Sequence, residues 1–99
     1  MAAVVNRLRF KEPVDPELFA RAERDLTSQM RAIDGFQEFH VIHTSDNEVV
    51  LVIFGDDADV LDRVATEVGS PWMTANVAPR LAGPPDRQIG PTIASSHSH

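Results

Sequence analysis

The chain contains no cysteine, no tyrosine and only one tryptophan. The lack of cysteine excludes a disulfide framework, a thiolate zinc site and a cysteine nucleophile, and the lack of tyrosine excludes any tyrosine-dependent mechanism. The longest wholly apolar run covers residues 49–54, far short of the roughly 20 residues that span a bilayer. Residues 1–6 show no basic region followed by a long apolar one, so no signal peptide is expected. We therefore expect a soluble, cytoplasmic protein that does not act at a membrane.

Basic residues are also few, since 9 Lys and Arg stand against 15 Asp and Glu, for a formal net charge of −6. Phosphate binding needs a concentrated basic surface, so nucleic acid is not an expected partner. The 99 residues are 42% hydrophobic, which predicts one globular domain. We assign this domain to residues 1–95 and expect 96–99 to be a flexible tail. Because so small a domain buries a limited core, oligomerisation would help to stabilise it.

Apolar and polar side chains alternate over residues 2–10, which predicts a strand. One face of this strand is expected to carry Val4, Asn6, Leu8 and Phe10. The opposite face is expected to carry Ala3, Val5, Arg7 and Arg9.

A helix is predicted to begin at Asp15-Pro16, where Asp15 caps free backbone N–H groups, and to end at Gly35, which can adopt a left-handed conformation. Its solvated face is assigned to Arg21, Glu23, Arg24, Asp25 and Arg31. Residues 36–44 and 48–54 then predict two strands, which the short polar turn between them joins as an antiparallel hairpin.

A second helical region is predicted from residues 55–57 to about Leu81. Gly69 interrupts it, and Ser70 is expected to act as the N-cap of a helix that restarts with Pro71 at its first position. Residues 88–95 predict a fourth strand, and Gly90-Pro91 within it favours an edge position. The order β-α-β-β-α-β predicts an α+β, ferredoxin-like fold, in which an antiparallel four-stranded sheet carries two helices on one face.

The third predicted strand is apolar on both faces, with Val50, Val52 and Phe54 on one face and Val49, Leu51 and Ile53 on the other, so one apolar face is left without helices. An exposed sheet face normally alternates apolar with polar residues. The simplest cover is an identical sheet, so we predict a homodimer whose two sheets pack face to face into an α/β barrel. The alternative is a monomer that leaves a few valines exposed.

The element order, the length and the segment Gly69-Ser70-Pro71-Trp72 resemble the dimeric α/β-barrel superfamily, and within it the antibiotic biosynthesis monooxygenase type. The resemblance covers residues 2 to 95. It implies an oxidoreductase that needs no metal or bound cofactor and acts on a planar aromatic substrate, such as a quinol or polyphenol. The substrate would lie between the helices and the sheet, lose a proton and react directly with oxygen, while the protein binds and orients it.

By the same resemblance, Asn6 and Trp72 look like the polar and aromatic pocket residues of that branch. The substrate-binding set that we predict is Asn6, Phe10, Trp72, Met73 and Asn76. A buried Asn6 amide needs a partner, which is either a ligand or a neighbouring backbone group. Trp72 either stacks on a ligand or simply packs under the sheet, and Met73 is an ordinary core residue in the simpler interpretation.

His40 and His43 are the candidate bases, because imidazole removes a phenolic proton near neutral pH. With Asn6 they complete the predicted catalytic set. They lie on opposite faces of one strand, so they cannot readily share a metal ion, and the alternative for each is a half-exposed side chain without a catalytic role. No metal site is predicted, because the acidic cluster at Asp56, Asp57, Asp59 and Asp62 lacks the Gly and Glu of a calcium loop and suits a helix start.

Two other functions remain open. The heme-degrading branch of the superfamily has an Asn-Arg-Leu in its first strand, which Asn6-Arg7-Leu8 matches. That branch also needs an axial His on the second helix, where this chain has Asn76 and Val77, so heme is disfavoured and no cofactor is expected. The second alternative is a non-catalytic dimer that binds a small hydrophobic ligand.

Overall fold

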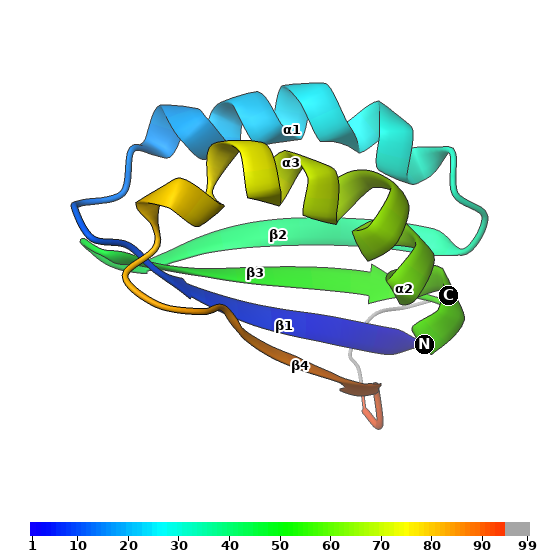
Figure 1. Cartoon of the computed structure of the whole chain (residues 1–99). Helices are drawn as coiled ribbons and strands as arrows, with labels where there is room; N and C mark the ends of the chain where they lie inside the picture. Colours follow the sequence, from blue (N-terminus) through cyan, green and yellow to red (C-terminus); the bar gives the residue numbers. More distant parts are fainter. Residues whose placement is uncertain (95–99) are drawn as a thin grey trace.

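The computed structural model describes residues 1–94 and shows a single four-stranded antiparallel sheet with helices over one face (Figure 1). The strands are β1 (Ala2–Arg9), β2 (Phe36–Ser45), β3 (Glu48–Gly55) and β4 (Asp86–Pro91), and they stand in the order β2-β3-β1-β4. The helices are α1 (Pro16–Arg31), α2 (Ala58–Val64) and α3 (Ser70–Asn76), with a π-helical turn (Ala65–Gly69) between α2 and α3 and a 3-10 turn (Ala78–Arg80) after α3. The predicted ferredoxin-like fold is confirmed. The predicted tail, 96–99, lies outside the described residues, as does residue 95.

Helix α1 begins and ends as its sequence predicts. The Asp15 carboxylate accepts a hydrogen bond from the Glu17 backbone N–H at 3.0 Å, and Pro16 occupies the first turn, where its missing N–H is not needed. Gly35 follows the helix with a φ of +92°, a conformation that glycine adopts without steric cost. The buried face of the helix consists of Leu18, Ala22, Leu26 and Met30.

The second helical region differs from its prediction at the junction around Gly69. Ser70 is not an N-cap, because Gly69 and Ser70 both have helical backbone angles and no side-chain capping bond is present there. The Ser70 N–H instead donates to the Ala65 carbonyl, five residues back. Pro71 has no N–H for an ordinary helical bond, and its ring would crowd the carbonyl four residues earlier. A wider π-helical turn before it lets the chain continue without a break.

The last strand, β4, begins and ends earlier than predicted, at 86–91 instead of 88–95. Its length is limited by β1, which offers partners only from Arg7, opposite Asp86, to Ala2, opposite Pro91. Beyond that pair, one more hydrogen bond joins the Thr92 N–H to the Met1 carbonyl at 2.8 Å. Its predicted position at the edge of the sheet is correct.

The core lies between the sheet and the helices in two clusters. The first joins Val4, Ile53, Leu61 and Val64, and the second joins Leu8, Leu18, Val49 and Val77, all of which are nearly inaccessible to solvent. Trp72, on α3, packs against both clusters. The predicted inner face of β1, with Val4 and Leu8, therefore does face the helices.

The other face of the sheet carries no helix (Figure 1). Val5 and Ile42 are 42% and 49% exposed there, and Val50, Val52 and Phe54 are half-buried on the same face. Polar pairs border this apolar patch, among them Arg7 and Glu48, whose Nε and Oε1 atoms are 2.8 Å apart. Within residues 1–94 no helix is both long enough and apolar enough to cross a membrane.

Candidate functional site

A cleft with a volume of about 540 Å³ lies on the helix-covered side, between α1 and the outer strand β2. Its β2 side combines the apolar Phe36, Phe39 and Val41 with polar residues, which are Gln37, Glu38, His40 and His43. Its α1 side includes Phe19, Glu23, Thr27 and Arg31. Clefts of this size, with aromatic walls and a few polar groups, are typical of small-molecule sites.

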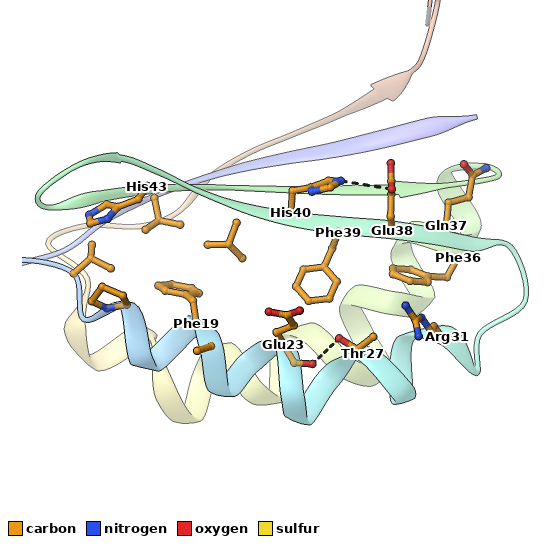
Figure 2. A pocket seen from close by; sticks show the side chains of 15 residues that line it. Phe19, Glu23, Thr27, Arg31, Phe36, Gln37, Glu38, Phe39, His40 and His43 are labelled. Atoms are coloured by element: carbon orange, nitrogen blue, oxygen red, sulfur yellow. Dashed lines mark hydrogen bonds and ion pairs between the residues drawn. The ribbon is translucent and has the colours of Figure 1, made fainter. Parts of the chain in front are cut away.

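The α1 side follows from helical periodicity, because Phe19, Glu23, Thr27 and Arg31 recur every fourth residue and so lie in one row beside the buried stripe. The rise of a helix makes this row about 18 Å long from Phe19 to Arg31. Figure 2 shows Arg31 at the end of the cleft near Phe36, whereas Phe19 lies toward the end with His43. The cleft is therefore elongated, with the Arg31 guanidinium at one end and the His43 imidazole at the other.

The two candidate histidines take different positions. His43 is opposite Val49 in the register of β2 and β3, on the face that α1 covers, and it lines the cleft. His40 borders the cleft from β2, but its ring lies over the helix-free face, where it contacts Phe54 edge-on at 6.4 Å between ring centroids. Its Nε2 atom is 3.6 Å from the Glu38 Oε2 atom (Figure 2). His43 is thus the imidazole presented to a ligand between α1 and the sheet.

Asn6 does not line this cleft. It lies on the helix-covered face of β1, in one cross-strand row with Val41 of β2, Leu51 of β3 and Arg87 of β4. Its Oδ1 atom is buried and accepts no hydrogen bond from residues 1–94. Buried polar atoms are nearly always hydrogen-bonded in proteins, so this unpaired acceptor needs an explanation. Trp72 packs against both core clusters, which lie on either side of Asn6 along β1.

The other predicted ligand residues contribute mainly to packing. Phe10 is 6% exposed within the second cluster, and Met73 packs against that cluster. The Asn76 amide donates to the Trp72 backbone carbonyl at 3.0 Å, one turn back in the same helix. Phe19 joins this region to the cleft, because its ring centroid is 6.1 Å from that of Phe10 and 6.4 Å from that of Trp72.

The sequence prediction missed the α1 side of the cleft. It assigned Glu23 and Arg31 to a solvated face, and both are indeed exposed, but they also border the cleft. Phe36 and Phe39 fall within the strand predicted at residues 36–44, and nothing in the sequence gives them a further role. The row at four-residue spacing was visible in the sequence, but nothing in it indicated that β2 leaves a gap opposite that row.

The acidic cluster serves the start of α2. Asp57 accepts a hydrogen bond from the Val60 N–H at 2.9 Å, and Asp56 accepts one from the Gln37 side-chain amide at 3.0 Å. In the described part of the chain no group of three or more metal-ligating side chains comes together. The heme position does not fit either, because the Asn76 amide is engaged with its own helix and Val77 is a fully buried aliphatic residue.

No family model matches the chain, and no curated protein matches it. Solved structures do match over nearly its whole length. A proposed antibiotic biosynthesis monooxygenase from Caulobacter crescentus superimposes with a TM-score of 0.72 at 18% identity, covering 94% of this chain and 90% of that one. SnoaB, a cofactor-independent oxygenase from Streptomyces nogalater, matches with a TM-score of 0.70 at 18% identity, covering 98% and 97% of the two chains.

A monooxygenase of Streptomyces coelicolor, solved in complex with the ligand nanaomycin D, matches with a TM-score of 0.68 at 21% identity and covers 98% and 92% of the two chains. The fold class is therefore the ferredoxin-like α+β class. Within that class, the solved neighbours are antibiotic biosynthesis monooxygenase-like proteins, in agreement with the resemblance seen in the sequence. At these identities the match establishes the fold.

Proposed function

We propose that the chain binds a planar aromatic ligand of the quinol or polyphenol type in the cleft between α1 and β2 and oxidises it with molecular oxygen, without a bound cofactor. The observation that carries this proposal is the cleft itself, in which Phe19, Phe36 and Phe39 surround an elongated space with His43 at one end. Aromatic rings favour stacked and edge-on contacts with another flat ring system. The shared fold with a cofactor-independent oxygenase supports the choice of chemistry.

The proposed reaction begins when the neutral His43 imidazole accepts the proton of a substrate hydroxyl. The resulting anion is electron-rich at ring carbon and reacts with O₂, which is the oxidant. One oxygen atom replaces hydrogen at that carbon as a carbonyl, and the other leaves as water with the two hydrogens that the substrate has lost. The balance requires no reductant, so the protein needs only to bind, orient and deprotonate the substrate.

Oxygen consumption with a panel of quinols and polyphenols tests this proposal. We expect turnover by the wild-type chain, and for His43→Asn a fall in kcat of at least about 100-fold with little change in ligand affinity, as is usual when a general base is lost. Thr44→Ala, next to His43 but on the other face of β2, is the matched control and should retain activity. Ligand binding without turnover by any compound would favour the non-catalytic alternative.

Asn6 and Trp72 form the second part of the proposal. The Asn6 Oδ1 atom lacks a donor, and a ligand hydroxyl that passes Phe19 toward Trp72 would supply one. We expect Asn6→Ala to abolish turnover while the oligomeric state stays the same. An unchanged rate would remove Asn6 from the site.

We also propose that a second copy of the chain covers the helix-free sheet face, because Val5 and Ile42 are too exposed there for a face that normally alternates with polar residues. Sedimentation equilibrium should show a dimer at micromolar concentration. Val52→Lys, which places a charge at the centre of the patch, should give a folded monomer. A wild-type monomer would contradict this part of the proposal.

A further inference from the structure

Glu23 brings a negative charge to the cleft that the proposed reaction does not use. Its side chain points from α1 into the space between the cleft's aromatic rings, with Phe19 on one side and Phe39 on the other (Figure 2). Among residues 1–94 its carboxylate accepts no hydrogen bond and forms no ion pair. The Thr27 hydroxyl donates to the backbone carbonyl of Glu23 and so leaves the carboxylate free.

The charged groups around the cleft lie far enough apart to act on different parts of a ligand. Arg31 is eight residues from Glu23 along α1, about 12 Å at the rise of a helix. His43 lies beyond Phe19 at the opposite end, and Glu38 and His40 border the cleft from β2. A flat ligand that lies along the cleft would therefore meet the carboxylate near its middle and the imidazole near one end.

We propose that Glu23 is a specificity residue that selects aromatic ligands with at least two free hydroxyl groups along their length, an inference that rests on the proposed function. Glu23 accepts the hydrogen bond of one hydroxyl and keeps that hydroxyl protonated. His43 takes the proton from another. The substrate class is then a flat aromatic diol or polyol, and not its methyl ethers.

The physical reason is the difference between the two acceptors. An ionised carboxylate only accepts hydrogen bonds, so it can bind a hydroxyl but not an ether oxygen. A hydroxyl beside it is hard to ionise, because the second negative charge would be repelled. The imidazole of His43 becomes positively charged when it accepts a proton and so attracts the anion that it creates. Glu23 thereby directs ionisation, and with it the attack of oxygen, to the end of the ligand near His43.

Calorimetric titration of the full chain with 2,6-dihydroxyanthraquinone and with its monomethyl ether, which keeps one hydroxyl for His43, tests the selectivity. We expect the wild type to bind the diol about five- to tenfold more tightly than the ether, the range of one hydrogen bond to a charged acceptor that is partly exposed to water. Glu23→Leu, which removes the acceptor, should bind the two compounds about equally. Asp25→Asn, on the solvated side of the same helix, removes one charge without touching the cleft and should keep the preference.

Glu23→Gln provides a second readout, because it keeps an acceptor and removes only the charge. Absorbance titration of the bound diol should show its ionisation about one pH unit lower in Glu23→Gln than in the wild type. If Glu23→Leu keeps the preference for the diol, or if Glu23→Gln leaves the titration unchanged, the inference is wrong while the proposed function stands. If neither compound binds the wild-type chain, both are wrong.

Discussion

Replacement of Asn6 by valine should make the protein more stable, which is unusual for a single substitution. The Asn6 Oδ1 atom is buried without a hydrogen bond, and an unpaired buried polar group costs about 1–3 kcal/mol. Asn6 as a whole is only half-buried, so the lower part of that range applies. Valine removes the unpaired oxygen and has a higher preference for strands. We expect the free energy of unfolding to rise by about 1–2 kcal/mol, which for a domain of this size raises Tm by about 5–10 °C.

Urea unfolding followed by tryptophan fluorescence measures this directly, because Trp72 is the only tryptophan and packs on both core clusters. The slope with denaturant should stay constant while the midpoint moves to higher urea. Asn6→Ala, which removes the amide but leaves a gap, should be near neutral. Asn6→Asp should have a free energy of unfolding at least about 2 kcal/mol lower than that of the wild type at pH 7, because burial penalises the charged carboxylate. This difference should shrink at pH 4, where the carboxyl is largely protonated.

A loss of stability in Asn6→Val of more than about 1 kcal/mol would refute this reasoning, because it would mean that the amide already has its partner in the free protein. The same variant also separates stability from function. If the Asn6 amide binds the substrate, turnover should fall although Tm rises, as is common where a polar group is kept for function.

Three further substitutions test how the fold positions the cleft. Gly35→Ala should lower stability by about 1–3 kcal/mol in urea unfolding, because φ is +92° and a new Cβ would stand 2.7 Å from the Val60 Cγ2 atom; an effect near zero would mean that this turn relaxes freely. Asp57→Ala should cost about 1 kcal/mol by the same assay through loss of the cap at the Val60 N–H, and Asp57→Asn should recover most of it. Leu61→Ala should cost about 2–5 kcal/mol, since Leu61 is 1% exposed, and a smaller loss would indicate that the first core cluster repacks.

Much of the fold follows from local patterns in the chain. Alternation over residues 2–10 fixes which side chains of β1 face the helices, and Asp15, Pro16 and Gly35 mark the two ends of α1. The bounds of an element were predicted less accurately where they depend on residues outside that element. The end of β4 depends on where β1 stops offering partners, and the passage through Gly69 depends on how a continuous helix accommodates Pro71.

The sequence by itself determined the α+β architecture, the two apolar faces of β3 and the opposite placement of His40 and His43, because each of these depends only on the period of a strand or helix. Tertiary structure decided the location of the cleft. Periodicity places Glu23 and Arg31 on the outer side of α1, but only the distance between α1 and β2 turns that side into the wall of a cleft opposite Phe39. Likewise, only packing leaves the Asn6 oxygen buried without a partner, since hydrogen bonds between distant segments cannot be read from local spacing.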